Sequence, residues 1–198
     1  MIRKIFFICL ISFFMMLSSA YPQKLIKAKI AIMHKYGNEY KPLRSNDRVH
    51  AGEMFRIFIK PFNNCYIYVI NTDNTGSSII FDNYVKAAGD TLILPSEDEF
   101  YVYDDKTPHS KITIFCSLKR IPEVEHLFIK KKETTEIDWN HVESVLLNKF
   151  NKNLNEKSAK PFSLAGNVSS ANEEFIEKQR ILTGKDLIIR KYEIEVQK

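Results

Sequence analysis

Apolar and polar side chains alternate with a period of two through most of the segment from Leu25 to Ile80, and this alternation limits the fold more than any other feature. In the run "LIKAKIAIM" the isoleucines share one face of an extended chain, while Lys27 and Lys29 lie on the other. Such a pattern is typical of a half-buried β-strand. Several similar runs follow, separated by segments rich in Gly, Asn, Asp and Pro, which favour chain reversals. We therefore predict a mainly β fold, a β-sandwich with immunoglobulin-like antiparallel strands.

The pattern changes after Leu118, where we predict two or three helices. The run "DWNHVESVLLNKF" carries an apolar stripe at helical spacing, with Asp138 as its expected N-cap. The run "SANEEFIEKQRILTG" begins with a capping box, Ser170 with Glu173, and is expected to end as a helix at Gly184. The chain closes on "LIIRKYEIEVQK", whose clean alternation predicts a strand that returns to the sandwich.

The N-terminus predicts export. The cations of "MIRK" precede the apolar run "IFFICLISFFMML", and the small residues "SSA" follow it. This order is typical of a secretory signal peptide, and we expect cleavage between Ala20 and Tyr21. The apolar run is shorter than the ~20 residues that a transmembrane helix needs, and no later segment is long and apolar enough to cross a membrane. We therefore expect a periplasmic or secreted protein.

The predicted organisation has one globular domain after the signal peptide, with a helical addition. Composition, turn signals and the change of period place the boundaries. The expected segments are the signal peptide (1–20), the β-sandwich core (21–120), a helical and loop insertion (121–185) and the C-terminal strand (186–198).

The charge balance argues against a nucleic-acid partner. The chain has 29 basic and 24 acidic residues, and loss of Arg3 and Lys4 with the signal peptide leaves 27 against 24, a net charge of +3. A nucleic-acid-binding protein needs a concentrated basic face. The triplet Lys130–Lys132 lies beside Glu133 and Glu136, and we interpret it as a solvated linker.

Two cysteines follow the predicted signal peptide, Cys65 and Cys116. In an oxidising compartment they form a candidate disulfide, provided that their strands are neighbours with compatible side-chain directions. Free cysteines also pack as small buried apolar side chains. Both interpretations stay open at this point.

The stretch "NTDNTGSSIIFD" has oxygen-bearing residues and a Gly at the spacing of a calcium-binding EF-hand loop. An EF-hand loop joins two helices, whereas this stretch joins two strand-type runs. We therefore predict a hairpin turn in which Gly76 takes a positive φ and Asp73 bonds the turn backbone. No metal site is predicted.

The segment "SEDEFYVYDD" combines acids with aromatic side chains. Its acids flank a strand of about 17 Å, too long for a glycosidase carboxylate pair to meet across it. We name Tyr101, Tyr103, Asp104 and Asp105 as a candidate ligand surface, and expect Tyr66 and Tyr68 to line the core or a groove.

Several turns and strands together resemble the uncharacterised bacterial family known as domain of unknown function 4384. The resemblance covers roughly Pro42 to Leu118 and the C-terminal strand, and it implies an exported bacterial module without assigned catalytic residues. Glu53 departs from the usual Asp, and Phe81-Asp82 from the usual Phe-Pro. The matching elements are Gly52-Glu53, Phe55–Ile59, Tyr66 and Tyr68, Asp73 with Gly76, and Leu92–Pro95.

The chain contains no nucleophile elbow, phosphate-binding loop or HExxH zinc motif, so we predict no catalytic, cofactor-binding or metal-binding residue. Our leading hypothesis is a non-catalytic module that binds a protein partner in the bacterial cell envelope through a sheet edge or a loop surface. Two alternatives stay open. One is a carbohydrate-binding module or glycan-active enzyme that uses the tyrosines and acidic loops, and the other is a structural subunit of an envelope assembly.

Overall fold

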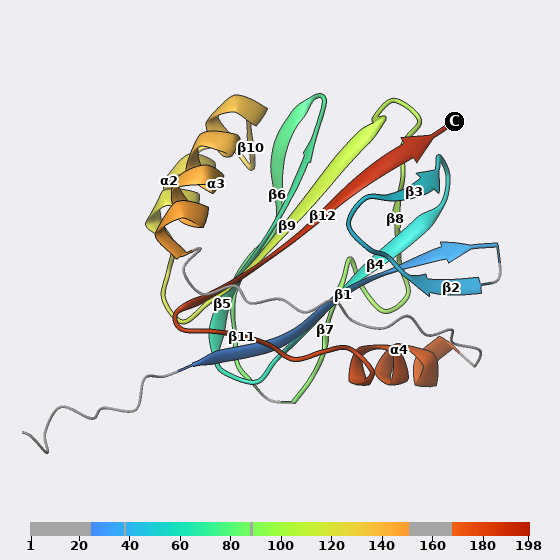
Figure 1. Cartoon of the computed structure of the whole chain (residues 1–198), viewed down its shortest axis with the longest axis horizontal. Coiled ribbons are helices and arrows are strands. Elements are labelled where there is room, and N and C mark those ends of the chain that lie inside the picture. The colour runs from blue at the N-terminus through green and yellow to red at the C-terminus, as the bar shows by residue number, and fades with distance from the viewer. Residues whose placement is uncertain (1–24, 38, 88, 151–167) are drawn as a thin grey trace, which may run out of the picture.

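A computed structural model describes residues 25–37, 39–87, 89–150 and 168–198. The predicted signal peptide, with its cleavage point between Ala20 and Tyr21, lies outside the described residues. The described chain is mainly β, as predicted, and two sheets pack face to face (Figure 1).

The first sheet, sheet A, has the order β11-β1-β4-β7, with β2 beside one end of β1 and β8 beside one end of β4. All of its pairs are antiparallel. The longest runs from Ala28↔Pro61 to Lys35↔Met54, where β-branched residues favour extended backbone. The strands are β1 (Ile26–Tyr36), β2 (Glu39–Pro42), β4 (Met54–Pro61), β7 (Leu92–Leu94), β8 (Tyr101–Val102) and β11 (Leu182–Gly184).

The second sheet, sheet B, has the order β10-β6-β5-β9-β12-β3. The C-terminal strand β12 pairs antiparallel with β9 and parallel with β3, so this sheet is mixed. The terminal strand therefore lies inside the sheet, because the short β3 covers its second edge. The strands are β3 (Asp47–His50), β5 (Cys65–Asp73), β6 (Gly76–Val85), β9 (His109–Ser117), β10 (Glu133–Thr134) and β12 (Leu187–Gln197).

The main core lies between the sheets. The period-two alternation of β1 directs Ile26, Ala28, Ile30 and Ile32 inward, and each is at most 6% exposed. Alternate residues of the neighbouring strand β4 and of the facing strands of sheet B complete this core, and their burial is the dominant favourable contribution to folding. They include Ile57 and Ile59 of β4, Ile67 and Val69 of β5, Ile112 and Ile114 of β9, and Ile188 and Ile194 of β12.

Helices cover the outer faces of both sheets (Figure 1). The helices α2 (Pro122–Phe128) and α3 (Glu136–Phe150) lie on sheet B, and α4 (Val168–Glu177) lies on sheet A. Trp139 of α3 is fully buried, with its ring centroid 5.9 Å from that of Phe115 and also from that of Phe128.

Two expected helix ends differ from those observed. Thr135, not Asp138, caps α3: its hydroxyl accepts the N–H of Asp138 at 3.1 Å and donates to that carboxylate at 2.7 Å. The helix α4 ends at Glu177, and Gly184 lies in β11, opposite Ile26. Pairing with β1 competes with helix continuation there, and local sequence cannot reveal this competition.

The predicted hairpin turn is confirmed. Asp73 of β5 pairs with Gly76 of β6, and the carboxylate of Asp73 accepts the N–H of Thr75 at 2.8 Å. Gly76 has a φ of 146°, and a Cβ there would lie 2.7 Å from the carbonyl oxygen of Thr134. Glycine is therefore required both by the turn and by the close approach of β10.

Cys65 and Cys116 lie on the neighbouring strands β5 and β9 as free, buried thiols. Cys116 is opposite Ile67, two residues from Cys65, so the cysteines form a diagonal pair. Diagonal neighbours are typically about 7–8 Å apart, longer than the usual Cα spacing of a disulfide. The candidate disulfide is therefore not formed in this structure, and the hydrogen bond with the Cys65 thiol, together with burial, raises the pKa of Cys116.

Candidate functional site

The candidate ligand surface at Tyr101, Tyr103, Asp104 and Asp105 does not form a platform in the structure. Tyr103 is only 4% exposed, and its ring stacks on Phe55 with centroids 4.5 Å apart. Tyr101 is half-buried against the same ring. The side chain that points outward here is Val102, which is 60% exposed. The strand alternates as predicted, but its aromatic face is the inner one.

The two acids of that surface belong to an exposed turn. The N–H of Lys106 donates to the carboxylate of Asp104 at 3.0 Å and lowers the pKa of Asp104. Asp105 is exposed beside it. Without an outward aromatic ring next to them, these acids form a solvated turn.

The acidic segment before β8 is held by a buried arginine. The guanidinium of Arg56 lies 3.6 Å from the centroid of the Phe100 ring, and its Nε donates to the carbonyl oxygen of Glu99 at 2.7 Å. Arg56 is only 2% exposed, and burial lowers its pKa from the ordinary value. These two contacts fix the segment on the outer face of sheet A.

A groove of about 510 Å³ lies on the outer face of sheet B, between β6 and the segment that follows α2. We call it the basic groove. Tyrosines of β5 and β6 form its floor, and the end of α2 with the lysine triplet forms its opposite wall. Its main charged and aromatic residues are Tyr66, Tyr84, Arg120, Glu125 and Lys130–Lys132.

Strand register builds the floor of the basic groove. Tyr66 of β5 is opposite Tyr84 of β6, and their ring centroids lie 5.0 Å apart at 55°. The guanidinium of Arg120 lies 5.4 Å from the centroid of the Tyr66 ring, which is within cation–π range. A hydrogen bond with Tyr66 and the charge of Glu125 raise the pKa of Arg120, so this side chain stays cationic.

Glu125 has its own partners. The buried hydroxyl of Tyr68 donates to Glu125 at 2.8 Å, and Arg120 forms an ion pair with the other carboxylate oxygen at 3.4 Å. The Tyr68 oxygen also accepts the N–H of Ile121, which fixes the start of α2. Burial raises the pKa of Tyr68, which therefore stays a neutral hydrogen-bond donor. The carboxylate of Glu125 is thus occupied and does not reach the lysines.

The triplet Lys130–Lys132 stands at the wall of the basic groove, where we had interpreted it as a solvated linker. All three side chains are exposed, and none has an ion-pair partner among the residues that the structure describes. The carbonyl oxygen of Lys132 accepts the N–H of Ile79 at 2.9 Å, which fixes the triplet beside β6. Sequence alone showed the triplet but not the strand edge next to it.

The edge of β6 is open beside this wall. On that side, β10 pairs only with Ser77 and Ser78. Within the described ranges, no strand covers the outer edge from Phe81 to Val85, although the register with β5 is regular there. The N–H of Tyr84 donates to the side chain of its neighbour Asn83 at 2.8 Å, not to a strand. An unpaired strand edge of this kind is a template for another extended chain.

A second hollow, of about 480 Å³, lies near the hairpin turn and collects the carboxylates of Asp73, Glu136, Glu193 and Glu195. Asp73 accepts bonds from the turn, Glu195 pairs with Arg48 at 2.9 Å, and Glu136 accepts from an asparagine of its own helix. No group of three or more His, Cys, Asp or Glu side chains in the described part of the chain could hold a metal ion.

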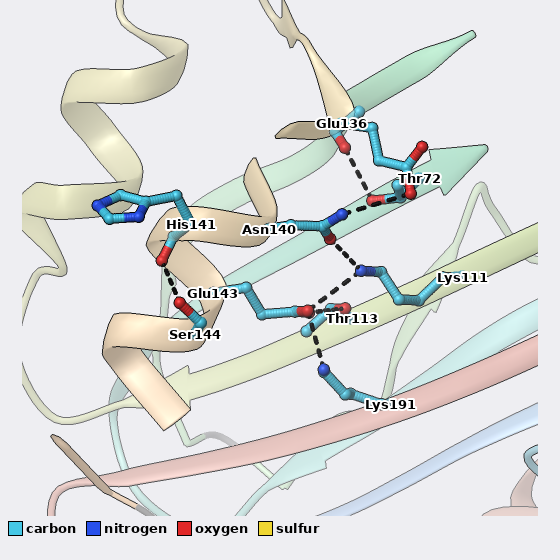
Figure 2. A network of polar contacts seen from close by, with 10 residues as sticks. Thr72, Lys111, Thr113, Glu136, Asn140, His141, Glu143, Ser144 and Lys191 are labelled. Carbon is cyan, nitrogen blue, oxygen red and sulfur yellow. Dashed lines mark hydrogen bonds and ion pairs between the residues drawn. The ribbon is translucent and has the colours of Figure 1, made fainter. Parts of the chain in front are cut away.

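Glu143 is the centre of a buried polar network under α3 (Figure 2). Its carboxylate accepts the hydroxyl of Thr113 at 2.7 Å and the ammonium groups of Lys111 at 3.1 Å and Lys191 at 2.8 Å. Burial alone would raise the pKa of Glu143, but the bonds from Lys191 and Thr113 and the charge of Lys111 outweigh it, so the pKa is lowered. We interpret this satisfied network as the attachment of α3 to sheet B.

No helix of the described residues is long and apolar enough to cross a membrane. No protein-family model, curated protein or solved structure matches the chain. The resemblance to the uncharacterised family therefore stays a prediction, and the function has to be argued from the site.

Proposed function

We propose that this chain is an exported, non-catalytic β-sandwich module that binds a protein partner in the bacterial cell envelope. The partner adds an extended segment to the open edge of β6, beside the basic groove. The observation that carries this proposal is the edge from Phe81 to Val85, which adjoins an open groove and pairs with no strand among the residues that the structure describes. Strand addition of this kind draws affinity from main-chain hydrogen bonds and specificity from side-chain pockets. Export rests on the signal-peptide pattern at the N-terminus.

The geometry favours this function over binding of a neutral glycan. A sugar platform needs exposed, coplanar aromatic rings, whereas Tyr66 and Tyr84 are tilted by 55° and Tyr103 is buried. A glycan-active enzyme needs carboxylates available in one cleft. In the second hollow, near the hairpin turn, three of the four carboxylates already have partners: Asp73 in the turn, Glu195 with Arg48, and Glu136 within its helix.

A site-specific crosslinking experiment tests the proposal. A photo-crosslinking residue replaces Ile129, which is 74% exposed at the basic groove, or Ile181, a matched isoleucine that is 46% exposed beside sheet A. In intact cells we expect a protein adduct from position 129 and none from position 181. A glycan adduct, or no adduct at position 129, would contradict the proposal.

Two further variants show whether the adduct depends on the strand edge. Tyr84→Pro removes an outward N–H that does not bond to β5, so it blocks an added strand while leaving the sheet intact. Tyr84→Phe keeps the N–H and serves as the control. The adduct should disappear with Pro and persist with Phe, whereas an adduct that survives both changes would place the partner on another surface.

A further inference from the structure

The two faces of β6 offer different chemistry to a strand that pairs with it. Side chains of an added strand point alternately to the two faces of the sheet. Tyr84 and Asp82 mark the outer face, since they pair with Tyr66 and Tyr68 beside the basic groove. Phe81, Asn83 and Val85 alternate with them and mark the inner face, since they pair with the core residues Val69, Ile67 and Cys65.

The outer face has an excess of positive charge. Four cationic side chains, Arg120 and Lys130–Lys132, line the basic groove against two carboxylates, Asp82 and Glu125, an excess of two charges. Glu125 is engaged by Tyr68 and Arg120. The lysines have no ion-pair partner within the described chain, so their positive potential is available to a ligand.

The inner face is apolar at Phe81 and Val85, and the exposed Asn83 lies between these two residues. Phe81 is opposite Val69 and Val85 is opposite Cys65, and both of these β5 residues belong to the main core. Phe81 and Val85 are themselves half-buried and pack against that core. An apolar side chain of an added strand would therefore extend the core at this edge.

We infer that the segment recognised by β6 alternates acidic and apolar side chains, with the acids toward the lysines and the apolar residues toward Phe81 and Val85. This inference rests on the proposed function and specifies its ligand. The recognised chemistry is an extended acidic peptide. Its main chain pairs with β6, and its carboxylates neutralise the excess positive charge of the basic groove.

A second copy of this chain fits the edge less well. Pairing of β6 with β6 would bring two lysine triplets together on one face of the joined sheet, and like charges oppose such an approach. A polyanion such as nucleic acid could meet the lysines, but it has no main-chain amides to pair with the strand. Of the three candidates, only the acidic strand uses both the main-chain edge of β6 and the lysine triplet. The experiment below distinguishes it from a second copy of the chain and from a nucleic acid.

The experiment measures binding of labelled peptides to the purified exported chain by fluorescence anisotropy. The peptides have about eight residues, enough to span Phe81–Val85. One alternates Glu with Val, one Gln with Val and one Lys with Val, and a fourth has the Glu and Val residues in blocks. We expect the Glu–Val alternation to bind about tenfold more tightly than the Gln–Val alternation, since three partly exposed ion pairs supply about this factor. Lys–Val should be the weakest.

Charge reversal supplies the matched control. Lys130→Glu, Lys131→Glu and Lys132→Glu together should invert the preference between Glu–Val and Lys–Val, while Tyr84→Pro should remove binding of both. Raising the salt concentration should weaken the Glu–Val complex, because partly exposed charges are screened.

The peptide series tests the acidic preference, the alternation and strand addition separately. Equal binding of Glu–Val and Gln–Val would overturn the acidic preference and leave strand addition standing. Equal binding of the alternating and block peptides would overturn the alternation. Binding of none of these peptides would overturn the proposed function as well. Tighter binding of a single-stranded oligonucleotide that survives Tyr84→Pro would show that the lysines recognise a polyanion, and self-association lost with Tyr84→Pro would assign the edge to a second copy.

Discussion

The outer face of sheet B carries two groups of lysines with opposite surroundings. Under α3, Lys111 and Lys191 bond to the carboxylate of Glu143, which is only 4% exposed. Beside α2, the triplet Lys130–Lys132 is exposed and has no ion-pair partner among the described residues. The positive charges of the first group are neutralised by Glu143 within the fold, whereas those of the second group are available to another molecule. Lysine content alone therefore says little, because the nearby carboxylates decide whether a cation stabilises the fold or recognises a ligand.

The strongest test of this comparison is Glu143→Ala. Removing the carboxylate leaves Lys191 and the hydroxyl of Thr113 without their partner under α3, while Lys111 keeps only its bond to Asn140. We expect the free energy of unfolding to fall by about 3 kcal/mol, near the lower end for a broken buried ion pair, because the lysines keep some contact with water. Urea denaturation measures this change.

Glu136→Ala is the matched control for that experiment, since Glu136 is exposed on the same helix. Its effect should stay below about 1 kcal/mol. An equal effect of the two substitutions would mean that the network under α3 does not differ energetically from an ordinary surface contact.

Thr113→Val should have the next largest effect. Thr113 is fully buried and donates to Glu143 at 2.7 Å, and Val has nearly the same shape without the hydroxyl. Loss of a hydrogen bond to a charged group should lower the free energy of unfolding by about 1.5–2 kcal/mol. In the Glu143→Ala background the same substitution should have almost no effect. A double-mutant cycle measures this coupling, and additive effects would contradict it.

The network also predicts a dependence of stability on pH. The pKa of Glu143 is lowered on folding, so its stabilisation is fully present above the unfolded value of about 4.3 and is lost as the pH falls through the folded value. The difference in unfolding free energy between the native chain and Glu143→Gln should therefore shrink below about pH 4, by at most about 1.4 kcal/mol per pH unit. Denaturation at a series of pH values measures it, and a constant difference would show that folding does not lower the pKa of Glu143.

The smallest effect on stability is expected from Lys130→Ala, Lys131→Ala and Lys132→Ala combined. Within the described part of the chain the side chains of the exposed triplet have no partner to lose, so the free energy of unfolding should change by no more than about 0.5 kcal/mol. Binding of the acidic alternating peptide should nevertheless weaken about tenfold. A loss of stability comparable to that of Glu143→Ala would remove the distinction between the two lysine groups.

Much of the strand structure could be predicted because it depends on residues that are close together in the sequence. The alternation of β1 and β12, and the turn between Asp73 and Gly76, depend on residues close together in the chain. The side chains that face outward or lie in the basic groove could not be identified in this way. Alternation predicts that Tyr101 and Tyr103 share a face, but it does not say that this face is the inner one. Similarly, Glu143 follows Val142 in a predicted helix, and only the packing of α3 places its carboxylate beside Lys111 and Lys191.

The sequence by itself therefore determined the mainly β class and the hairpin, since side-chain period and glycine conformation are local properties. It also displayed the lysine triplet, without indicating its role. The tertiary structure decided that Glu133 and Thr134 pair with β6 for only two residues. Among the described residues, that short pairing leaves the edge of Phe81–Val85 without a partner strand and holds the lysines beside it. No local pattern contains this property, because an open edge depends on which distant segments pair with a strand and which do not.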